Sequence, residues 1–439
     1  MRSAPETSAV AYRFDNYFWY SASSALMLAG PFCVILILSR MASAQELGLY
    51  AYAYAVTAPI QAFAGLHARA FIAMDRLFGY YVEDVLAQRA YLGAALVVTA
   101  LAVPVLRGAG SRETCVFLGV VAVRLAEGLT DVSAGMMQRC HQPRLIALMY
   151  GFRGVLGLTM FAVLLAFDAP LGVALAGMGF AGLVAFFVVD RALLASIAAA
   201  PKLRVACMSL ATPRPLLLGL KLLPGAVLAA LAVVETNLPR YIVEAFINIT
   251  AVGVYTTLGV LLSVATNLIH PVFFMTFARL GQTAQHRDPE SRRNLVRIVW
   301  TNVALTVGFS AILVTVCVGF GSSILNLVFG SEWARFGDLL SILAVGAGAS
   351  LLRSCLGFAL TGLNVFAPQT IITLGSAAIF IAFATLFGGQ LDAFGVGLAW
   401  VSASLLAVAA NAVVLGAALR RQRLAPDVPS LAAGVQLGG

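Results

Sequence analysis

The sequence predicts an all-α polytopic membrane protein of about twelve transmembrane helices, arranged as two six-helix bundles in parallel repeat. Three observations lead to this fold class. Of the 439 residues, 61% are hydrophobic and 11% are charged, whereas a soluble domain carries about 25% charged residues. The hydrophobic residues are gathered in about twelve stretches, each near the roughly 20 residues that a helix needs to cross a bilayer. A motif of glycine and tyrosine also recurs about half a chain later.

Each hydrophobic stretch is predicted to be a helix, because backbone groups in lipid must pair within the protein. The first six are predicted at 17–39, 48–74, 90–106, 114–136, 146–166 and 170–190. The second six are predicted at 215–237, 248–272, 298–320, 338–361, 368–388 and 393–418. The connection from 191 to 214 divides the chain into two predicted domains, an N-terminal six-helix bundle (residues 1–200) and a C-terminal six-helix bundle (residues 201–439).

Arginine and lysine are distributed unequally between the loops on the two sides of the membrane. An even number of helices puts both termini on one side, and 18 basic residues fall in the tails and loops of that side. The opposite loops hold five, which are Arg40, Arg107, Arg112, Arg240 and Arg335. Basic residues accumulate in cytoplasmic loops. We therefore expect a multi-pass protein of the bacterial inner membrane with both termini in the cytoplasm, and this topology explains the net charge of +9 without a nucleic-acid partner.

The repeated motif places the two halves in the same orientation. Gly48-Leu49-Tyr50 opens the second predicted helix, and Gly253-Val254-Tyr255 lies near the start of the eighth, 205 residues later. In each case an apolar helix and a short turn precede the motif. Because each half has an even number of helices, the halves are predicted to run parallel, as in one common plan of transporters.

The sequence lacks the motifs of the common enzyme active sites. It contains no nucleophile elbow, phosphate loop, zinc-binding helix or dinucleotide fingerprint. The six cysteines are scattered singly, without the spacing of a metal site or a disulfide framework. We therefore predict no catalytic residue, no metal and no cofactor.

Three segments, in a fixed order along the chain, carry a resemblance to a known family. They are LSRMASAQELGLYAYAYAV (Leu38 to Val56) with the following FAGLHARAF, LPRYIVEAFINITAVGVYTTLGVL (Leu238 to Leu261), and LNLVFGSEWARFGDLLSILA (Leu325 to Ala344). They resemble the polysaccharide-biosynthesis flippases of the O-antigen type, in the multidrug/oligosaccharidyl-lipid/polysaccharide exporter superfamily. The peptidoglycan-precursor flippases are similar too, but they tend to have fourteen helices, and this sequence has about twelve.

The resemblance implies a central cavity between the bundles that opens alternately to either side of the membrane. It also implies a lipid-linked oligosaccharide, a polyprenyl-diphosphate-glycan, as cargo for surface polysaccharide synthesis. The implied partners are this anionic lipid, the membrane lipid around it, and a polysaccharide polymerase or glycosyltransferases. One alternative is a cation-coupled exporter of small molecules or drugs, whose members commonly carry an acid in the first helices; the stretch 18–39 has none. Another is a membrane glycosyltransferase or polymerase, which would be expected to have long outward loops, whereas here they are short.

Charged side chains within the predicted helices are the candidates for a transport site, because each costs about 2.5 to 3.5 kcal/mol to insert. An arginine can donate two hydrogen bonds at once to a phosphate. The candidate substrate-binding residues are Arg69, Arg124, Arg153, Lys221 and Arg353. Arg69 and Lys221 are predicted near the cytoplasmic boundary, where they could instead extend to water.

Two acids accompany these cations in the fourth predicted helix. Arg124, Glu127 and Asp131 are spaced i, i+3 and i+7 and so share one helix face. Arg153 on the next helix is predicted at the same depth. Glu127 and Asp131 therefore form either an ion-coupling site or a structural salt-bridge network. A third acid, Glu235, is expected near the outer end of its helix, with Arg240 as its partner.

Overall fold

The computed structural model describes residues 6–65, 69, 72, 82–140, 142–197, 214–269, 289–363, 365, 367–388 and 393–424. Within these ranges the chain is helical and has no strand. The N-terminal half contains α1 (Glu6–Met41), α2 (Ala44–Gly65), α4 (Val82–Leu106), α5 (Ser111–Arg139), α6 (Pro143–Ala166) and α7 (Leu171–Ala185), and α7 continues through the π-helical segment η1 (Phe186–Asp190) into α8 (Arg191–Ala195). The C-terminal half contains α9 (Arg214–Phe246), α10 (Ile249–Asn267), α12 (Pro289–Phe329), the short 3-10 helix η3 (Ser331–Phe336), α13 (Gly337–Gly362), α14 (Ala367–Gly388) and α15 (Ala393–Leu424).

The predicted all-α membrane fold is confirmed. In the described part of the chain, nine helices are long and apolar enough to cross a membrane. The other three long helices, α2, α5 and α9, carry many of the polar and charged side chains of the interior and pack in the order α5, α2, α9. Each predicted apolar stretch corresponds to one helix, so the hydropathy of the sequence located every long helix.

Several helices extend further than the sequence predicted, and two of these extensions contain arginines of the protein interior. α4 begins at Val82 instead of residue 90, and α9 continues to Phe246 instead of ending at residue 237. Arg89 and Arg240, which the loop assignment placed outside the helices, therefore lie within them. The prediction was wrong here because hydropathy measures exposure to lipid, whereas a helix continues wherever its polar side chains face the protein interior.

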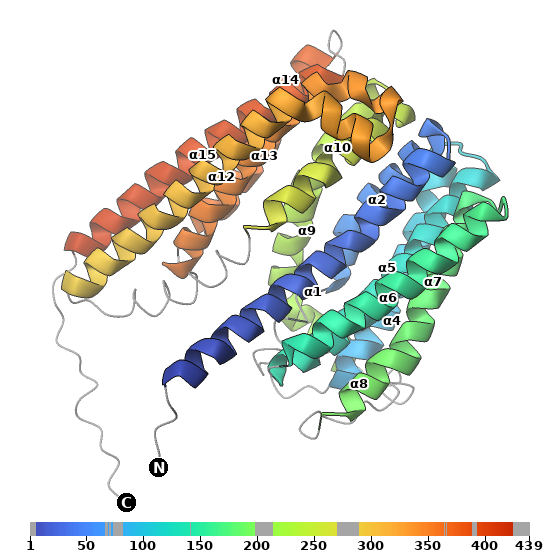
Figure 1. The fold of residues 1–439 in the computed structure, drawn as a ribbon, viewed down its shortest axis with the longest axis horizontal. Coiled ribbons are helices and arrows are strands. Elements are labelled where there is room, and N and C mark those ends of the chain that lie inside the picture. The colour runs from blue at the N-terminus through green and yellow to red at the C-terminus, as the bar shows by residue number, and fades with distance from the viewer. Residues whose placement is uncertain are drawn as a thin grey trace, which may run out of the picture.

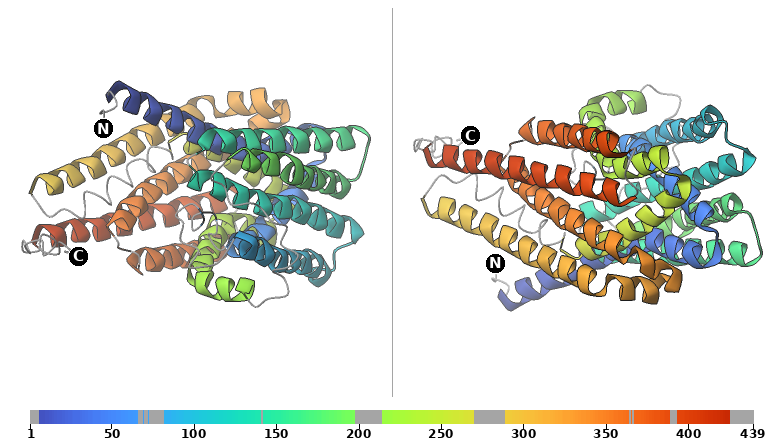
Figure 2. Two further views of the ribbon diagram at one scale, coloured as in Figure 1. Left: turned by 90° about the horizontal axis from the view of Figure 1, so that it is seen from below. Right: turned by 90° about the horizontal axis from the view of Figure 1, so that it is seen from above.

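The helices converge at one end of the molecule and diverge at the other. In Figures 1 and 2, α1 begins and α15 ends at the same end, which we call the terminal end. At the opposite end, which we call the closed end, the turn between α1 and α2 lies beside the turn between α9 and α10. α9 and α10 lie between the helices of the N-terminal half and the group α12 to α15 (Figure 1).

The closed end is organised by two equivalent helix starts. Ser43 and Glu46 form a capping box before α2, in which each side chain accepts a hydrogen bond of 3.2 Å from the other's backbone N–H. Asn248, 205 residues after Ser43, caps α10 by accepting a hydrogen bond of 2.8 Å from the N–H of Ala251. The starts of α2 and α10 are therefore fixed by local sequence at equivalent positions of the repeat.

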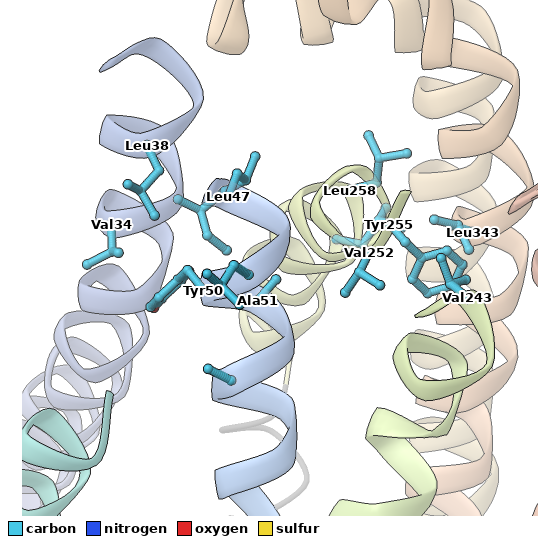
Figure 3. Packing of buried hydrophobic residues seen from close by; sticks show 14 of the residues in the cluster. Val34, Leu38, Leu47, Tyr50, Ala51, Val243, Val252, Tyr255, Leu258 and Leu343 are labelled. Atoms are coloured by element: carbon cyan, nitrogen blue, oxygen red, sulfur yellow. The ribbon is translucent and has the colours of Figure 1, made fainter. Parts of the chain in front are cut away.

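Gly48 of α2 and Gly253 of α10 meet directly at this end. A Cβ atom on Gly48 would lie 1.9 Å from the carbonyl oxygen of Ile249, and one on Gly253 would lie 2.9 Å from the backbone nitrogen of Gly48. Such distances are below any van der Waals contact, so the close approach of α2 and α10 requires glycine at these positions. The two copies of the repeated motif thus contact each other, and Figure 3 shows Leu47 and Tyr50 of α2 near the buried residues of α10.

The helix contacts of the two halves are related by the same repeat. α5 packs on α7 as α13 packs on α15, α4 on α5 as α12 on α13, and α1 on α6 as α9 on α14. Between the halves, α1 contacts α10 as α2 contacts α9, and α1 contacts α12 as α4 contacts α9. The repeat exchanges α2 with α10, so the contact between these two helices is related to itself. The pseudo-two-fold axis therefore passes through the Gly48–Gly253 pair.

Three polar contacts join the halves around this axis, and one of them is the hydrogen bond of 2.6 Å that Tyr241 of α9 donates to the carbonyl oxygen of Ala55 in α2. Arg107, after α4, forms an ion pair of 2.5 Å with Glu244 of α9 and lies over the ring of Tyr52 at 4.5 Å. Arg40, at the end of α1, donates a hydrogen bond of 2.7 Å to the carbonyl oxygen of Val328. In this conformation the halves are therefore held together at the closed end.

We expect Gly48→Ala to lower the thermal stability of the purified protein, because the methyl group would push α2 away from α10. Overpacking of this kind costs about 1 to 3 kcal/mol. The matched control is Gly259→Ala in α10, where an added Cβ has no neighbour within 4 Å. Thermal unfolding in detergent should show a lower Tm for Gly48→Ala and an unchanged or higher Tm for Gly259→Ala. Equal effects of the two substitutions would contradict the close contact.

Candidate functional site: two charged cavities related by the repeat

Each half of the protein encloses a cavity with charged residues in its wall. The N-terminal cavity, of about 270 Å³, is lined by α1, α2, α5, α6 and α7. The C-terminal cavity, of about 340 Å³, is lined by α9, α10, α13, α14 and α15. These are the first, second, fourth, fifth and sixth long helices of each half. The repeat therefore extends from the helix contacts to the cavities, and each half lines one cavity with its own helices.

Glu127 in the N-terminal cavity is shared by two arginines. Arg124 donates to its Oε2 at 3.1 Å, and Arg153 of α6 lies 3.6 Å from its Oε1. The predicted link of Glu127 to both arginines is therefore confirmed. Arg124 is also held by α2, since it donates a hydrogen bond of 3.1 Å to the carbonyl oxygen of Tyr54 and its guanidinium lies 3.5 Å from the centre of that ring. This arginine joins α2 to α5 as well as facing the cavity.

Asp131 is connected to an arginine through the hydroxyl group of a tyrosine. The hydroxyl of Tyr150 on α6 donates to the Oδ1 of Asp131 at 3.4 Å and accepts a hydrogen bond of 3.1 Å from Arg69. Arg69 also donates to the side-chain oxygen of Gln138 at 3.3 Å. The structure thus links Arg69 to Asp131 through Tyr150, a connection that the sequence did not predict because Arg69 was assigned to the cytoplasmic boundary of its own helix.

Arg89 is a buried cation that the loop assignment missed. Its side chain on α4 is only 7% exposed, and it donates a hydrogen bond of 3.2 Å to the carbonyl oxygen of Gly65. It also interacts electrostatically with Asp131. The sequence did contain an indication that Arg89 belongs to a helix. It lies just before an apolar stretch, and four hydrophobic residues precede it, which are Val82, Val85, Leu86 and Ala87.

Arg353 and Glu235 form a bidentate ion pair across the C-terminal cavity. Both guanidinium nitrogens of Arg353 on α13 donate to the two carboxylate oxygens of Glu235 on α9, the second at 3.2 Å. The expected pairing of Glu235 with Arg240 is therefore wrong. Arg353 lies on the fourth long helix of its half, as Arg124 does in the N-terminal half, so each cavity has an arginine on the corresponding helix.

Arg240 also lines the C-terminal cavity. It donates a hydrogen bond of 2.5 Å to the side-chain oxygen of Asn237 and interacts electrostatically with Tyr54 and Tyr241. Within the described residues it forms no ion pair with a carboxylate. The wall also holds uncharged polar groups, which are Thr236, Ser263, Thr266, Asn267, Ser350, Ser354, Ser376 and Ser404.

The five predicted cations are therefore divided between the halves. Arg69, Arg124 and Arg153 belong to the N-terminal network, whereas Arg353 belongs to the C-terminal cavity. Lys221 lies on α9, but its side chain is outside the described residues. The N-terminal cavity wall has two arginines and two acids, and the C-terminal cavity wall has two arginines and one acid. The C-terminal cavity thus carries the surplus of positive charge.

A double-mutant cycle tests the N-terminal network. Glu127→Gln and Arg153→Gln should each lower the stability of the protein, because each leaves a partly buried charge without its partner. The double change should be less harmful than the sum of the single changes, by an interaction energy of about 0.5 to 3 kcal/mol. Thermal unfolding of the four purified proteins gives this energy, and strict additivity would separate the two residues. The control pair Glu127→Gln and Arg297→Gln, with Arg297 exposed on α12, should be additive.

Comparison with known proteins finds one similar sequence and several structures of the same fold. No family model matches the sequence. The chain is 24% identical over 366 residues to the capsular polysaccharide biosynthesis protein CapF of Staphylococcus aureus, and the match covers 82% of this chain and 85% of that protein.

Solved structures of MATE transporters share the fold over nearly the whole chain. An inward-facing multidrug resistance MATE transporter of the MOP superfamily has a TM-score of 0.63 at 14% identity and covers 93% of this chain and 95% of its own. The bent form of the Vibrio cholerae MATE transporter VcmN has a TM-score of 0.60 at 15% identity and covers 95% of this chain and 98% of its own. The chain is therefore similar in sequence to a capsular polysaccharide biosynthesis protein and shares its fold with solved MATE transporters, one of which is described as a member of the MOP superfamily, in agreement with the resemblance of its sequence motifs.

Proposed function

We propose that this multi-pass membrane protein is a flippase, not an enzyme, that moves a lipid-linked oligosaccharide from the cytoplasmic to the periplasmic leaflet for surface polysaccharide synthesis. The observation that carries the proposal is the C-terminal cavity, in which Arg240 faces the space without a carboxylate partner in the described residues. A diphosphate headgroup is anionic and loses its hydration when it enters the membrane. A cation that is not already neutralised can replace part of that hydration.

The cavity suits a polar headgroup by its size and its wall. Its volume of about 340 Å³ lies within the range of about 300 to 1,000 Å³ typical of small-molecule sites. The hydroxyl and amide groups around Arg240 can bond with sugar hydroxyls, while Arg353 can exchange its partner Glu235 for a phosphate oxygen. The named function of the sequence relative, capsular polysaccharide biosynthesis, supports a glycan as cargo.

The N-terminal cavity supports a different role within the same cycle. Both of its arginines are paired with Glu127, and Asp131 adds a second negative charge to the cavity wall, so it offers a diphosphate less net attraction. We assign Arg69, Arg124 and Arg153 to the structure and the coupling of this half, and Arg240 and Arg353 to the headgroup. A polysaccharide polymerase or glycosyltransferase would then supply or receive the lipid-linked glycan at the membrane.

Removal of the headgroup cations should block export of surface glycan. We expect Arg240→Ala and Arg353→Ala each to reduce glycan display by about tenfold or more, because a hydrogen bond to a charged group contributes about 1.5 to 3 kcal/mol. Lysine at either position should rescue display partly, since it keeps the charge but loses the planar fork. Quantitative staining of surface glycan and immunoblotting of membranes measure display and protein abundance.

The matched control is Arg297→Ala, which removes an exposed arginine of α12 outside both cavities and should leave display unchanged. Wild-type display in both cavity variants, together with altered resistance to cationic dyes, would contradict glycan flipping. That result would favour the alternative of small-molecule efflux, the activity named for the multidrug MATE transporter that shares this fold.

We also propose that the terminal end of the molecule faces the cytoplasm, because most of the basic loop residues lie on that side of the predicted topology. Ser196, after α8 at the terminal end, and Ser111, at the start of α5 at the closed end, are both exposed. In spheroplasts, a membrane-impermeant maleimide should label Ser111→Cys at once and Ser196→Cys only after permeabilisation. The reverse pattern would invert the orientation. The parent protein with its native cysteines replaced is the labelling control.

A further inference from the structure

Asp190, the last residue of η1, is buried without a hydrogen-bond partner. Its side chain is 1% exposed, and neither carboxylate oxygen is hydrogen-bonded in the described part of the chain. The segment η1 is π-helical, an arrangement that adds a residue to one helical turn and occurs frequently at functional sites. This acid is outside the networks described above, and the sequence analysis did not single it out.

The groups around Asp190 can be named from each element packed on η1, which are α5, α6, α7 and α8. From α5, the hydroxyl of Ser133 interacts with the carboxyl group but is also buried without a hydrogen-bond partner. From α6, Arg153 is the charged residue that acts on it. α7 has no charged residue, and Arg191 of α8 has an exposed side chain.

Arg153 connects Asp190 to the N-terminal cavity. It lies in the cavity wall, 3.6 Å from Glu127. Its Nε lies 3.6 Å from the place where a Cβ on Gly182 would stand, so the guanidinium packs against the helix that leads to Asp190. Arg153 can therefore interact with two carboxyl groups, those of Glu127 and Asp190. In this conformation it forms no hydrogen bond with either oxygen of Asp190.

An ionised carboxylate in such a place is unfavourable by several kcal/mol, because it has lost its hydration without gaining a partner. A protonated carboxyl group avoids most of this cost. We propose that Asp190 is a proton-binding site, occupied in the conformation with the closed end shut, and that Arg153 displaces the proton by moving from Glu127 to Asp190. The proton leaves the carboxyl oxygen for water in the N-terminal cavity, and the negative charge left behind is then paired with the guanidinium.

Because Asp190 exchanges a proton for the guanidinium of Arg153, the conformation of the protein should depend on pH. The direction of this dependence follows from the exchange. Below the midpoint of the titration Asp190 holds its proton, Arg153 stays with Glu127, and the present conformation is favoured. Above the midpoint the ionised Asp190 attracts Arg153, and α6 shifts relative to α5 and η1. The inference concerns coupling and not cargo, so it can be tested without a cargo molecule and fails or succeeds independently of the proposed glycan.

The test is the distance between spin labels on the two halves, measured over a range of pH in the full-length protein in lipid nanodiscs. Labels on Ser196→Cys and Asn294→Cys, both exposed at the terminal end, report the separation of the halves in a background with the native cysteines replaced. We expect the distance distribution to change with pH in this parent protein. Asp190→Asn should show the low-pH distribution at every pH, because asparagine is permanently neutral.

Three further variants sharpen the assignment. Asp190→Glu should keep the pH dependence with a displaced midpoint, and Arg153→Gln should lose the pH dependence, because no guanidinium remains to move from Glu127 to the ionised carboxyl group. Asp168→Asn is the matched control, since Asp168 is exposed in the turn after α6 with a φ of 56°, which asparagine also tolerates. Its profile should equal that of the parent protein.

The proposal is overturned if the parent distribution does not vary with pH, or if Asp190→Asn keeps the parental pH profile. If Asp190→Asn does not fold, infrared difference spectra between acidic and alkaline samples decide the question. A protonated-carboxyl band that shifts with isotope-labelled aspartate, and that is lost in Asp190→Glu, supports the site. A band insensitive to the label, or no band, rejects it.

Discussion

The direct contact of the α2 and α10 backbones at Gly48 and Gly253 is the constraint on which the rest of the structure depends. A side chain at either position would overlap the opposite helix, so the two helices approach here more closely than side chains normally permit. The pseudo-two-fold axis passes through this point, and the contacts between α1 and α12 and between α4 and α9 are arranged symmetrically around it. The cavities then lie at equivalent places on either side, each lined by its own half.

The contacts around this point differ in kind. At the axis the backbones of α2 and α10 touch directly between buried side chains, whereas the ion pair of Arg107 with Glu244 and the hydrogen bond from Arg40 lie away from it. A rotation about the axis contact breaks those outlying interactions first. Each is a single charged group at a partly exposed site, where ion pairs contribute little to stability, so most of the attachment between the halves comes from the buried hydrophobic residues around the axis.

The sequence was sufficient to predict the fold, because the apolar stretches and the repeated Gly-x-Tyr motif are properties of local segments. It also predicted the cluster of Arg124, Glu127 and Arg153, since helical spacing and depth alone bring those side chains together. It failed where the outcome depended on tertiary packing. The pairing of Glu235 with Arg353 joins residues 118 positions apart, and Arg89 and Arg240 lie beyond the apolar stretches in helix ends that the protein interior covers. The burial of Asp190 likewise depends on a π-helical turn that no sequence pattern indicated.

The offset of 205 residues relates the first two helices of each half residue by residue, and it allows their side chains to be compared position by position. The offset relates the end of α1 at Met41 to the end of α9 at Phe246, and the start of α2 at Ala44 to the start of α10 at Ile249. By the same offset, Glu235 and Arg240 correspond to Gly30 and Ile35 of α1. An added Cβ on Gly30 would have no neighbour within 4 Å, so the N-terminal copy has open space where the C-terminal copy has a carboxylate. The two halves thus share the glycines of the axis but differ in the charges of their cavities, so one polypeptide combines a symmetric junction with two different interiors.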